Sequence, residues 1–308
     1  MCTYICRFVI PMRKISYTVP PALDGSSVAA VLRSHGFSTA LLRSLKKTYG
    51  ALSRNGCPVR TVDPVHTGDM VAVELNTGGA TAPPSAEKAV IVYADRDILV
   101  VNKRAGMAMY ETYNHHGNAL SNAVAAAGFD GPFRPIYRLD KDTSGLVVLA
   151  RHQLSAAKLA GKVQKDYYAV VPGTYTGSGT VDAPIAHCPD STVKRCVDPA
   201  GVRAVTHWEA LGQQGGRTLL RVQLETGRTH QIRVHFAHLG TPLVGDSLYG
   251  TAPIGARHLL HCKTIRLMHP VREEPVVFDC PFPSDMEEWN QCLPTAPTTS
   301  LPASCCPP

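Results

Sequence analysis

Short β-type runs, each bounded by Gly or Pro, are the feature that most constrains how this chain of 308 residues can fold. Strand-forming and turn-forming residues alternate in this way in sheets whose strands are joined by tight connections. The strongest helix candidates in the same part of the chain are 121–127 and 154–163. The pattern predicts an α+β fold with a mixed, largely antiparallel sheet. The runs lie at 98–102, 146–149, 167–171, 202–208, 219–224, 232–236 and 276–278.

The chain is long enough for two units. A stretch rich in Gly, Pro and Thr at 76–86 interrupts the periodic sequence and is the expected linker. We therefore predict a small unit at 1–75 and a larger one at 87–293. The last segment, 294–308, is rich in Pro, Thr and Ser, which predicts a disordered tail.

The small unit has the pattern of two short helices followed by strands, an αα-β arrangement. Ser26 or Ser27 can cap the first helix, and Ser38 can cap the second. Residues 1–90 hold 10 Lys and Arg against 5 Asp and Glu, which is +5 of the total net charge of +7. Such a basic face is typical of RNA-binding units, although a solvated face on a packing unit has the same composition. The basic side chains concerned are those of Arg43, Lys46, Lys47 and Arg54.

Composition excludes several classes of protein. A hydrophobic fraction of 44% and a charged fraction of 18% are ordinary for a globular chain and exclude wholesale disorder. No stretch approaches the roughly 20 apolar residues of a membrane span, and the N-terminus lacks the pattern of a secretory signal. Ten cysteines without any C-x-x-C pair predict reduced thiols, hence a cytoplasmic protein without structural zinc. Phosphate-binding glycine motifs are absent, so no nucleotide cofactor is expected.

Two segments are denser in polar groups than a core requires, and the first is 134–150. Here Asp140 follows Arg138 and precedes Lys141, so its carboxylate should be ionised at neutral pH. An ionised carboxylate can act as a nucleophile or as a base. The same Asp, Thr, Ser and Gly residues also form ordinary turns, and composition alone leaves both interpretations open.

The second polar segment is 224–250. It places Arg228 and Arg233 close together at the start of the predicted strand 232–236, where a guanidinium could pair with a carboxylate or a phosphate. Three histidines in this segment raise the possibility of a metal site. On a strand, however, His230 and His235 would face opposite sides, and no H-E-x-x-H spacing is present, so no metal is expected.

These two segments carry a family resemblance. The sequence YRLDKDTSGL at 137–146 resembles the H-R-L-D-x-x-T-S-G-L signature of RluA-type pseudouridine synthases. Further segments resemble that family in the same order: DILVVNKRAG at 97–106, KDY at 165–167, TGRTHQIR at 226–233, GDSLYG at 245–250 and LH at 260–261. Residues 1–80 are similar to the small RNA-binding module of ribosomal proteins and tyrosyl-tRNA synthetases. Tyr137 replaces the usual His, and Arg104 replaces the usual Pro.

The resemblance implies the pseudouridine synthase fold and the isomerisation of uridine to pseudouridine in RNA without a cofactor. Asp140 corresponds to the family's essential Asp, which acts as a nucleophile at the ribose or as a base in a glycal route. Arg228 corresponds to the Arg that pairs with this Asp, although a structural salt bridge has the same geometry. Tyr167 corresponds to the residue that stacks on the uracil, and Arg138 to one that fills the place of the extruded base.

Other expectations concern the pocket and the partners. Leu260 should line the uracil pocket, Tyr168 should belong to the core, and Asp142, Thr143 and Asp246 should serve mainly turn structure. The extra N-terminal module favours structured RNA, and ribosomal RNA before transfer RNA. A monomer without an obligate protein partner or membrane contact is the default expectation.

Two alternatives belong to other classes of protein. A non-catalytic RNA-binding or ribosome-assembly protein on the same fold would keep the basic face and tolerate loss of the Asp140 carboxylate. A sugar hydrolase would require a second carboxylate placed for acid–base chemistry. Asp142 is the nearby candidate, and its turn setting beside Lys141 argues against that role.

Overall fold

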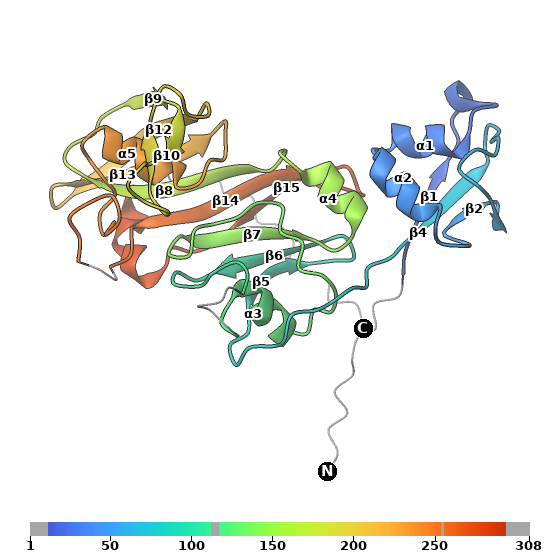
Figure 1. The fold of residues 1–308 in the computed structure, drawn as a ribbon, viewed down its shortest axis with the longest axis horizontal. Helices are drawn as coiled ribbons and strands as arrows, with labels where there is room; N and C mark the ends of the chain where they lie inside the picture. Colours follow the sequence, from blue (N-terminus) through green and yellow to red (C-terminus); the bar gives the residue numbers. More distant parts are fainter. Residues whose placement is uncertain (1–11, 112–116, 254–255, 294–308) are drawn as a thin grey trace, which may run out of the picture.

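The computed structural model describes residues 12–111, 117–253 and 256–293. The predicted tail at 294–308 lies outside these residues, as does the N-terminal end of the chain. Two sheets dominate the described part (Figure 1), a small one near the N-terminus and a nine-stranded one in the larger unit.

The N-terminal unit is a four-stranded antiparallel sheet with strand order β1-β4-β2-β3, accompanied by two helices. Ser27 caps α1 by accepting a hydrogen bond from the backbone N–H of Ala30, and Ser38 caps α2 in the same way from Leu41. Both predicted helix starts are therefore confirmed. The elements are β1 (Arg13–Thr18), a 3-10 turn η1 (Pro21–Leu23), α1 (Val28–Ser34), α2 (Thr39–Leu45), β2 (Leu52–Arg54), β3 (Cys57–Pro58) and β4 (Met70–Leu75).

The large sheet has the strand order β5-β6-β7-β14-β8-β13-β12-β9, and β15 pairs with β14. All of its pairings are antiparallel except the short one between β7 and β14. The predicted mixed, largely antiparallel α+β fold is confirmed. The strands are β5 (Val90–Ala94), β6 (Ile98–Lys103), β7 (Ser144–Ala150), β8 (Gln164–Pro172), β9 (Ser178–Asp182), β12 (Val205–Gln214), β13 (Arg217–Leu224), β14 (Leu260–Met268) and β15 (Pro275–Asp279), with a separate hairpin of β10 (Ile185–His187) and β11 (Arg195–Val197).

Few helices accompany this sheet. The predicted helices at 121–127 and 154–163 are present as α3 (Leu120–Ala126) and α4 (Gln153–Leu159), and a 3-10 segment η2 (Ser284–Cys292) follows the last strand. The predicted strand at 232–236 is wrong, because these residues belong to the helix α5 (Gln231–His238). No helix in the described residues is long and apolar enough to cross a membrane.

The two units are in contact through α4 and through the first strand. Leu154 of α4 is buried among the core residues of the N-terminal unit, and α4 lies next to that unit in Figure 1. Arg13 of β1 donates two hydrogen bonds, of 2.8 and 3.1 Å, to the carboxylate of Asp97. Lys158 of α4 forms an ion pair of 2.8 Å with Glu273. The contacts of Leu154 and Arg13 tie the N-terminal unit to the large one, and the ion pair holds α4 to the connection between β14 and β15.

Candidate active site

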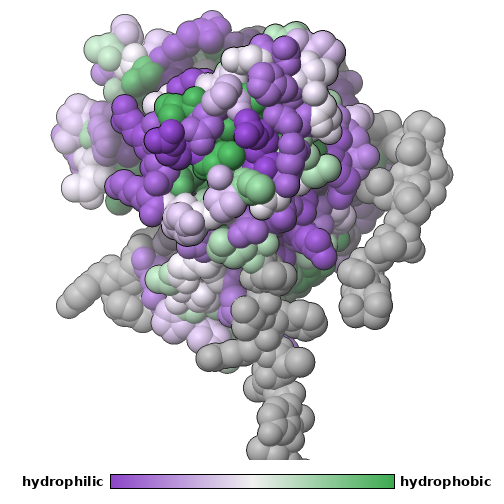
Figure 2. Space-filling view, turned by 90° about the vertical axis from the view of Figure 1, so that its right-hand side faces the viewer, coloured by the Kyte–Doolittle hydropathy of each residue, from purple (hydrophilic) through white to green (hydrophobic). Residues whose placement is uncertain are grey.

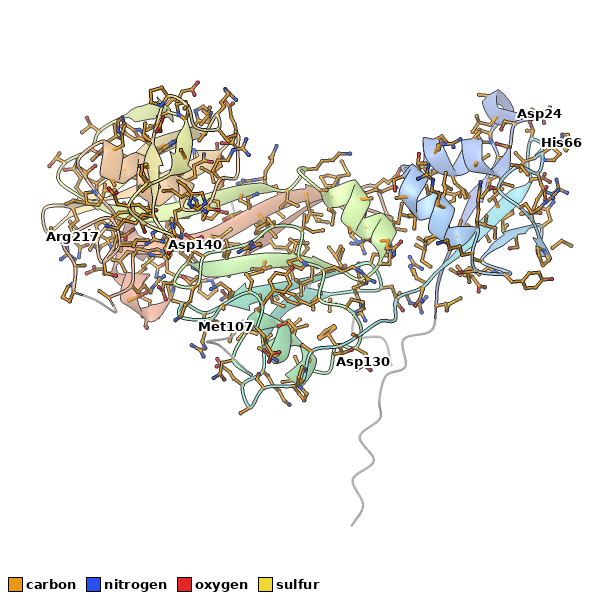
Figure 3. All side chains as sticks on the ribbon, viewed as in Figure 1. Asp24, His66, Met107, Asp130, Asp140 and Arg217 are labelled. Carbon is orange, nitrogen blue, oxygen red and sulfur yellow. The ribbon has the colours of Figure 1, made fainter. Side chains whose placement is uncertain are left out.

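A pocket of about 740 Å³ opens in the large unit, and both polar segments found in the sequence contribute to it. In Figure 3 its residue Asp140 lies well away from Asp24 and His66 of the small unit. The volume falls in the range of small-molecule sites, which is about 300–1,000 Å³. The residues that line it include Met109, Arg138, Asp140, Tyr167, Arg228, His230, Arg233 and Leu260.

The loop that carries Asp140 is held on its C-terminal side by β14 and the residues just before that strand. At its C-terminal end Gly145 has a φ of +117°, and a Cβ there would collide with the backbone of Cys262 in β14. Glycine therefore permits the close approach of β7 and β14 where the loop ends. The hydroxyl of Thr143 hydrogen-bonds Nε2 of His258 at 2.8 Å, and Arg257 donates to the carbonyl oxygen of Asp142 at 2.7 Å. Thr143 and Asp142 thus stabilise the turn.

A buried lysine also holds the loop that carries Asp140. The side chain of Lys103 at the end of β6 is fully buried and donates to the carbonyl oxygens of Arg104, Met107 and Lys141, the last at 2.8 Å. Burial lowers the pKa of Lys103 to about 7. Because Lys141 directly follows Asp140, this ammonium fixes the backbone beside the candidate carboxylate.

Asp140 faces the pocket with a side chain that is 27% exposed. Its Oδ2 accepts a hydrogen bond of 3.4 Å from Nη1 of Arg233 and lies 3.9 Å from Nε2 of His230. Arg233 is itself held by the buried Asp246 through hydrogen bonds of 2.7 and 3.0 Å. Burial alone would lower the pKa of Arg233, but Asp246 outweighs it and raises that pKa. The guanidinium of Arg233 therefore lies between two carboxylates, those of Asp140 and Asp246.

The partner predicted for Asp140 is therefore corrected. Arg233, and not Arg228, forms the ion pair. Arg228 lines the pocket too, but its side chain is exposed and its Nε donates to the carbonyl oxygen of Arg203 at 3.1 Å. The reason is the helix α5, which was predicted to be a strand. Arg228 lies in the turn before this helix, whereas Arg233 lies in its first turn, buried against Asp246.

The turn into α5 is stabilised by one glutamine. The Oε1 of Gln231 accepts hydrogen bonds from the backbone N–H of Arg228 and from the hydroxyl of Thr226, both at 2.9 Å. Its Nε2 donates to the carbonyl oxygen of Val205 in β12. His230 has a φ of +57° at the start of the helix, and its ring hydrogen-bonds the hydroxyl of Tyr249 at 2.9 Å. Burial lowers the pKa of His230.

The remaining predicted pocket residues lie around Asp140. Tyr167 in β8 is buried and lines the pocket, as does Leu260 at the start of β14. Arg138 is exposed at the pocket and is two residues before Asp140. Tyr168 faces the other side of the sheet, where its ring packs 5.4 Å from that of Phe282, so its predicted place in the core is confirmed.

The supporting roles of Asp246 and Lys103 in this site were not predicted from the sequence. Asp246 was predicted to serve turn structure, and it does accept from the backbone N–H groups of Leu248 and Tyr249, but it also holds Arg233. Lys103 was not singled out, because a lysine at the end of an apolar strand has no local signal for burial. Its contacts join residues far apart in the chain, such as Lys141.

The basic residues predicted to bind RNA lie in the other unit. Arg43, Lys46 and Lys47 are exposed on and after α2. Arg54 differs from them, because its Nη1 donates to the carbonyl oxygen of Pro64 and its Nε lies 3.9 Å from Asp69.

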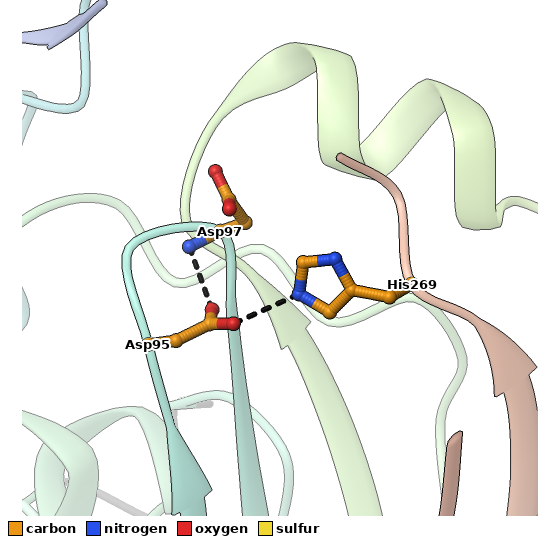
Figure 4. Close-up of side chains that lie close together, drawn as sticks. All are labelled: Asp95, Asp97 and His269. Atoms are coloured by element: carbon orange, nitrogen blue, oxygen red, sulfur yellow. Dashed lines mark hydrogen bonds and ion pairs between the residues drawn. The ribbon is translucent and has the colours of Figure 1, made fainter. Parts of the chain in front are cut away.

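A separate group of potential metal ligands was found by geometry in the described part of the chain. It consists of Asp95, Asp97 and His269 near the contact between the two units (Figure 4). His269 donates to Asp95 at 2.8 Å, and Arg13 and His152 donate to Asp97. Since these ligand atoms are occupied by protein hydrogen bonds, the group is a structural network.

Known proteins are similar to this chain in the segments that form the candidate site. The family model of RNA pseudouridylate synthase matches residues 97–238, which include Asp140, Tyr167 and Arg233. An uncharacterised RNA pseudouridine synthase, YjbO of Bacillus subtilis, is 36% identical over 266 residues, which cover 82% of this chain and 94% of that protein. The chain belongs to the RNA pseudouridine synthase family. It is therefore an enzyme that isomerises uridine to pseudouridine in RNA, and the RluA-type resemblance is confirmed.

Further members of the family agree with this assignment. The ribosomal large subunit pseudouridine synthase D of Xanthomonas campestris is 36% identical over 302 residues, with 89% of this chain and 91% of that protein covered. Among solved structures, human RNA pseudouridylate synthase domain containing 1 is similar with a TM-score of 0.52 and 27% identity, over 68% of this chain and 89% of that one.

Proposed function

We propose that this synthase modifies uridines in structured RNA, and ribosomal RNA in particular, with Asp140 acting at the ribose and without a cofactor. The observation that carries the proposal is the setting of Asp140, an accessible carboxylate that accepts a hydrogen bond from Arg233, which is itself held by a buried acid. Such a carboxylate is oriented yet has lone pairs free to face a substrate. The family names of two relatives, which refer to the ribosomal large subunit, favour ribosomal RNA.

The reaction requires that one bond breaks and another forms at the same carbon. The bond between ribose C1′ and uracil N1 breaks, the uracil turns, and C5 forms a bond to C1′; C5 then loses its proton, and N1 ends with a proton in place of the ribose. Asp140 serves this sequence either by bonding to C1′ and leaving again, or by removing and returning a proton of the ribose. In both routes the carboxylate also stabilises positive charge that develops on the sugar.

Three neighbours have separate parts in this proposal. Tyr167 presents its aromatic ring to the uracil while the base turns, because a ring face binds a base without fixing its edge. Arg138 enters the space that the base leaves in the RNA stack, since the ribose carbon is inaccessible in a stacked strand. Leu260 supplies an apolar wall of the uracil pocket. Arg228 binds a backbone phosphate at the pocket, which its exposed side chain permits.

The N-terminal unit is proposed to locate the enzyme on folded RNA. The exposed side chains of Arg43, Lys46 and Lys47 can neutralise phosphates, with a smaller part for Arg54. In this proposal the unit that locates the RNA ends at residue 75, and the catalytic unit begins at residue 87. We further propose that the enzyme works in the reducing cytoplasm and as a monomer.

The test maps pseudouridines in total RNA from a strain that lacks the gene. The strain is rescued with the wild type, with Asp140→Asn, or with Asp142→Asn as a matched control for the neighbouring carboxylate. We expect that the wild type and Asp142→Asn restore one or more ribosomal sites and that Asp140→Asn restores none. Full restoration by Asp140→Asn would refute the proposed role of Asp140 and favour a binding role for the chain at those sites. Loss confined to transfer RNA would correct the substrate.

A further inference from the structure

A groove of about 570 Å³ lies on the N-terminal unit, apart from the candidate active site. It is formed between the end of α2 with the residues that follow it and the connection between β3 and β4. Figure 2, which faces this unit, shows hydrophobic residues on its surface within a hydrophilic surrounding. Its lining includes Leu45, Lys46, Tyr49, Leu52, Arg60 and Val62.

An aromatic side chain stands exposed at this groove. Tyr49 is 96% exposed, and Val62 across the groove is 65% exposed, whereas Leu45 and Leu52 form a buried apolar base. Within the described residues Tyr49 makes no hydrogen bond and no ring contact. Large aromatic side chains usually bury most of their surface, so a fully exposed ring beside an apolar base is a candidate contact for a planar ligand.

The charge around the groove favours an anionic ligand. Lys46 lines it and, as far as the structure describes the chain, its ammonium has no carboxylate or hydrogen-bond partner. The Arg60 side chain is 82% exposed, and its Nη2 lies 3.1 Å from Asp63. Asp63 is the one acid in the lining, and its carboxylate accepts from the backbone N–H and the side chain of Arg60. Two cations and one acid leave the lining with a net charge of +1, and Lys46 continues the basic face that Arg43 begins.

We infer that this groove binds an unpaired nucleotide of the RNA, with its base stacked on Tyr49 and its phosphates on Lys46 and Arg60. This inference rests on the proposed RNA-binding role of the N-terminal unit and deepens it. A duplex offers this surface only phosphates, because its bases are stacked inside, whereas a single strand offers base faces and phosphates together. The groove therefore makes the unit selective for RNA that offers an unpaired nucleotide.

The experiment compares two RNA probes on the full chain. One is a blunt-ended RNA hairpin, and the other is the same hairpin with a uridine-rich single-stranded tail, each measured by fluorescence anisotropy at one fixed salt concentration. Stacking of one base implies that Tyr49→Ala weakens binding of the tailed probe at least about five-fold. Binding of the blunt probe should change less than about two-fold. Tyr49→Phe keeps the ring and should bind both probes like the wild type.

A matched control replaces another exposed apolar side chain of the same unit. Met70 in β4 is 54% exposed and does not line the groove, so Met70→Ala should bind both probes like the wild type. The inference is overturned if Tyr49→Ala binds the tailed probe like the wild type, since the groove then takes some other ligand. It is also overturned if Tyr49→Phe is as weak as Tyr49→Ala, because the hydroxyl group and not the ring face would then be the contact.

Failure of the inference and failure of the proposed function give different results. Pseudouridine mapping with Asp140→Asn tests the proposed function by itself, because the carboxylate is expected to act after binding. Binding of both probes that ignores Tyr49 removes only the nucleotide groove and leaves the isomerase proposal standing. A wild type that binds neither probe removes both the groove and the RNA-binding role of the unit.

Discussion

Two groups of carboxylates in the large unit differ in how many hydrogen bonds their oxygens accept. Asp95 and Asp97 form the first group, and Asp140 alone is the second. Asp95 accepts five hydrogen bonds of 2.8 to 3.0 Å, from two backbone N–H groups and three side chains, and Asp97 accepts three of 2.8 to 3.1 Å. Asp140 accepts one of 3.4 Å from Arg233 and faces a pocket. The first group is saturated by the protein, and the second is oriented but left open. A saturated carboxylate stabilises the fold, and an open one is available for chemistry.

The largest expected effect is the loss of activity when Asp140, the open carboxylate, is replaced. Asp140→Asn should lower the conversion of target RNA at least about a thousand-fold, because loss of the group that attacks or abstracts a proton removes a covalent step. Its free energy of unfolding should change by less than about 1 kcal/mol, because only one long hydrogen bond is altered. Pseudouridine formation under single-turnover conditions and urea denaturation measure the two quantities. A large loss of stability would show that Asp140 belongs with the saturated carboxylates.

The opposite outcome is expected for Asp97→Asn. Asp97 is 4% exposed and paired with Arg13 and His152, so the substitution should lower the free energy of unfolding by about 3 kcal/mol. Turnover per folded molecule should stay within about two-fold of the wild type, because the group is remote from the pocket. Urea denaturation checks the first value, and activity normalised to folded protein checks the second.

An exposed ion pair supplies the control for this variant. Asp182 is 58% exposed and lies 3.8 Å from Arg203, so Asp182→Asn should cost less than about 0.5 kcal/mol. If Asp97→Asn costs no more than that, then the network in Figure 4 does not stabilise the chain and the comparison fails.

Much of the fold and of the site could be predicted from local sequence signals. The serine caps at Ser27 and Ser38, the helices α3 and α4, and the opposite faces of Tyr167 and Tyr168 each depend on a few neighbouring residues. Family resemblance added the pocket, since it brought together segments that periodicity alone could not pair.

The helix α5 was predicted wrongly for a physical reason. Polar and apolar side chains alternate over residues 231–236, which is the period of a strand, but all six are buried in the structure, so the alternation does not mark an exposed face. The signal that favours a helix lies just beyond it, because Gly240 has a φ of +78° and closes the helix as a C-terminal glycine does. Arg233 follows from this helix, and a contact across 93 residues to Asp140 leaves no local trace.

The correction of the arginine partner gives the next prediction. Arg233→Lys should lower turnover about 10- to 100-fold, because a lysine cannot hold Asp246 with two hydrogen bonds and reach Asp140 as well. Arg228→Lys keeps the charge at an exposed position and should weaken apparent RNA affinity less than about three-fold, with turnover unchanged.

The split between turnover and affinity decides which arginine orients Asp140. Steady-state rates at saturating RNA give the first quantity, and their dependence on RNA concentration gives the second. A large turnover defect in Arg228→Lys with a normal Arg233→Lys would restore the partner that the family resemblance implied.

The last prediction concerns the stability of the chain in acid and again separates the open site from the saturated one. His258 and His261 hydrogen-bond Thr143 and Ser144 where β7 meets β14, and their pKa values are lowered to about 3, first by burial and then by nearby arginines. Unfolding restores the ordinary value of 6.5, so the unfolded chain binds more protons between pH 6.5 and 3. Stability should therefore fall in this window as pH falls, by about 1.4 kcal/mol per pH unit for each histidine.

The lowered pKa of Asp97 acts in a different window. Burial would raise that pKa, but the hydrogen bonds from His152 and Arg13 outweigh burial and hold it below the ordinary 3.8. Its contribution is present above pH 3.8 and is lost only as pH falls further. Urea denaturation between pH 6.5 and 4.5 measures how the free energy of unfolding depends on pH. This dependence should be weaker in His258→Gln and His261→Asn than in the wild type, and it should equal that of the wild type in Asp97→Asn. An equal slope in all three variants would mean that other groups govern the acid sensitivity of this junction.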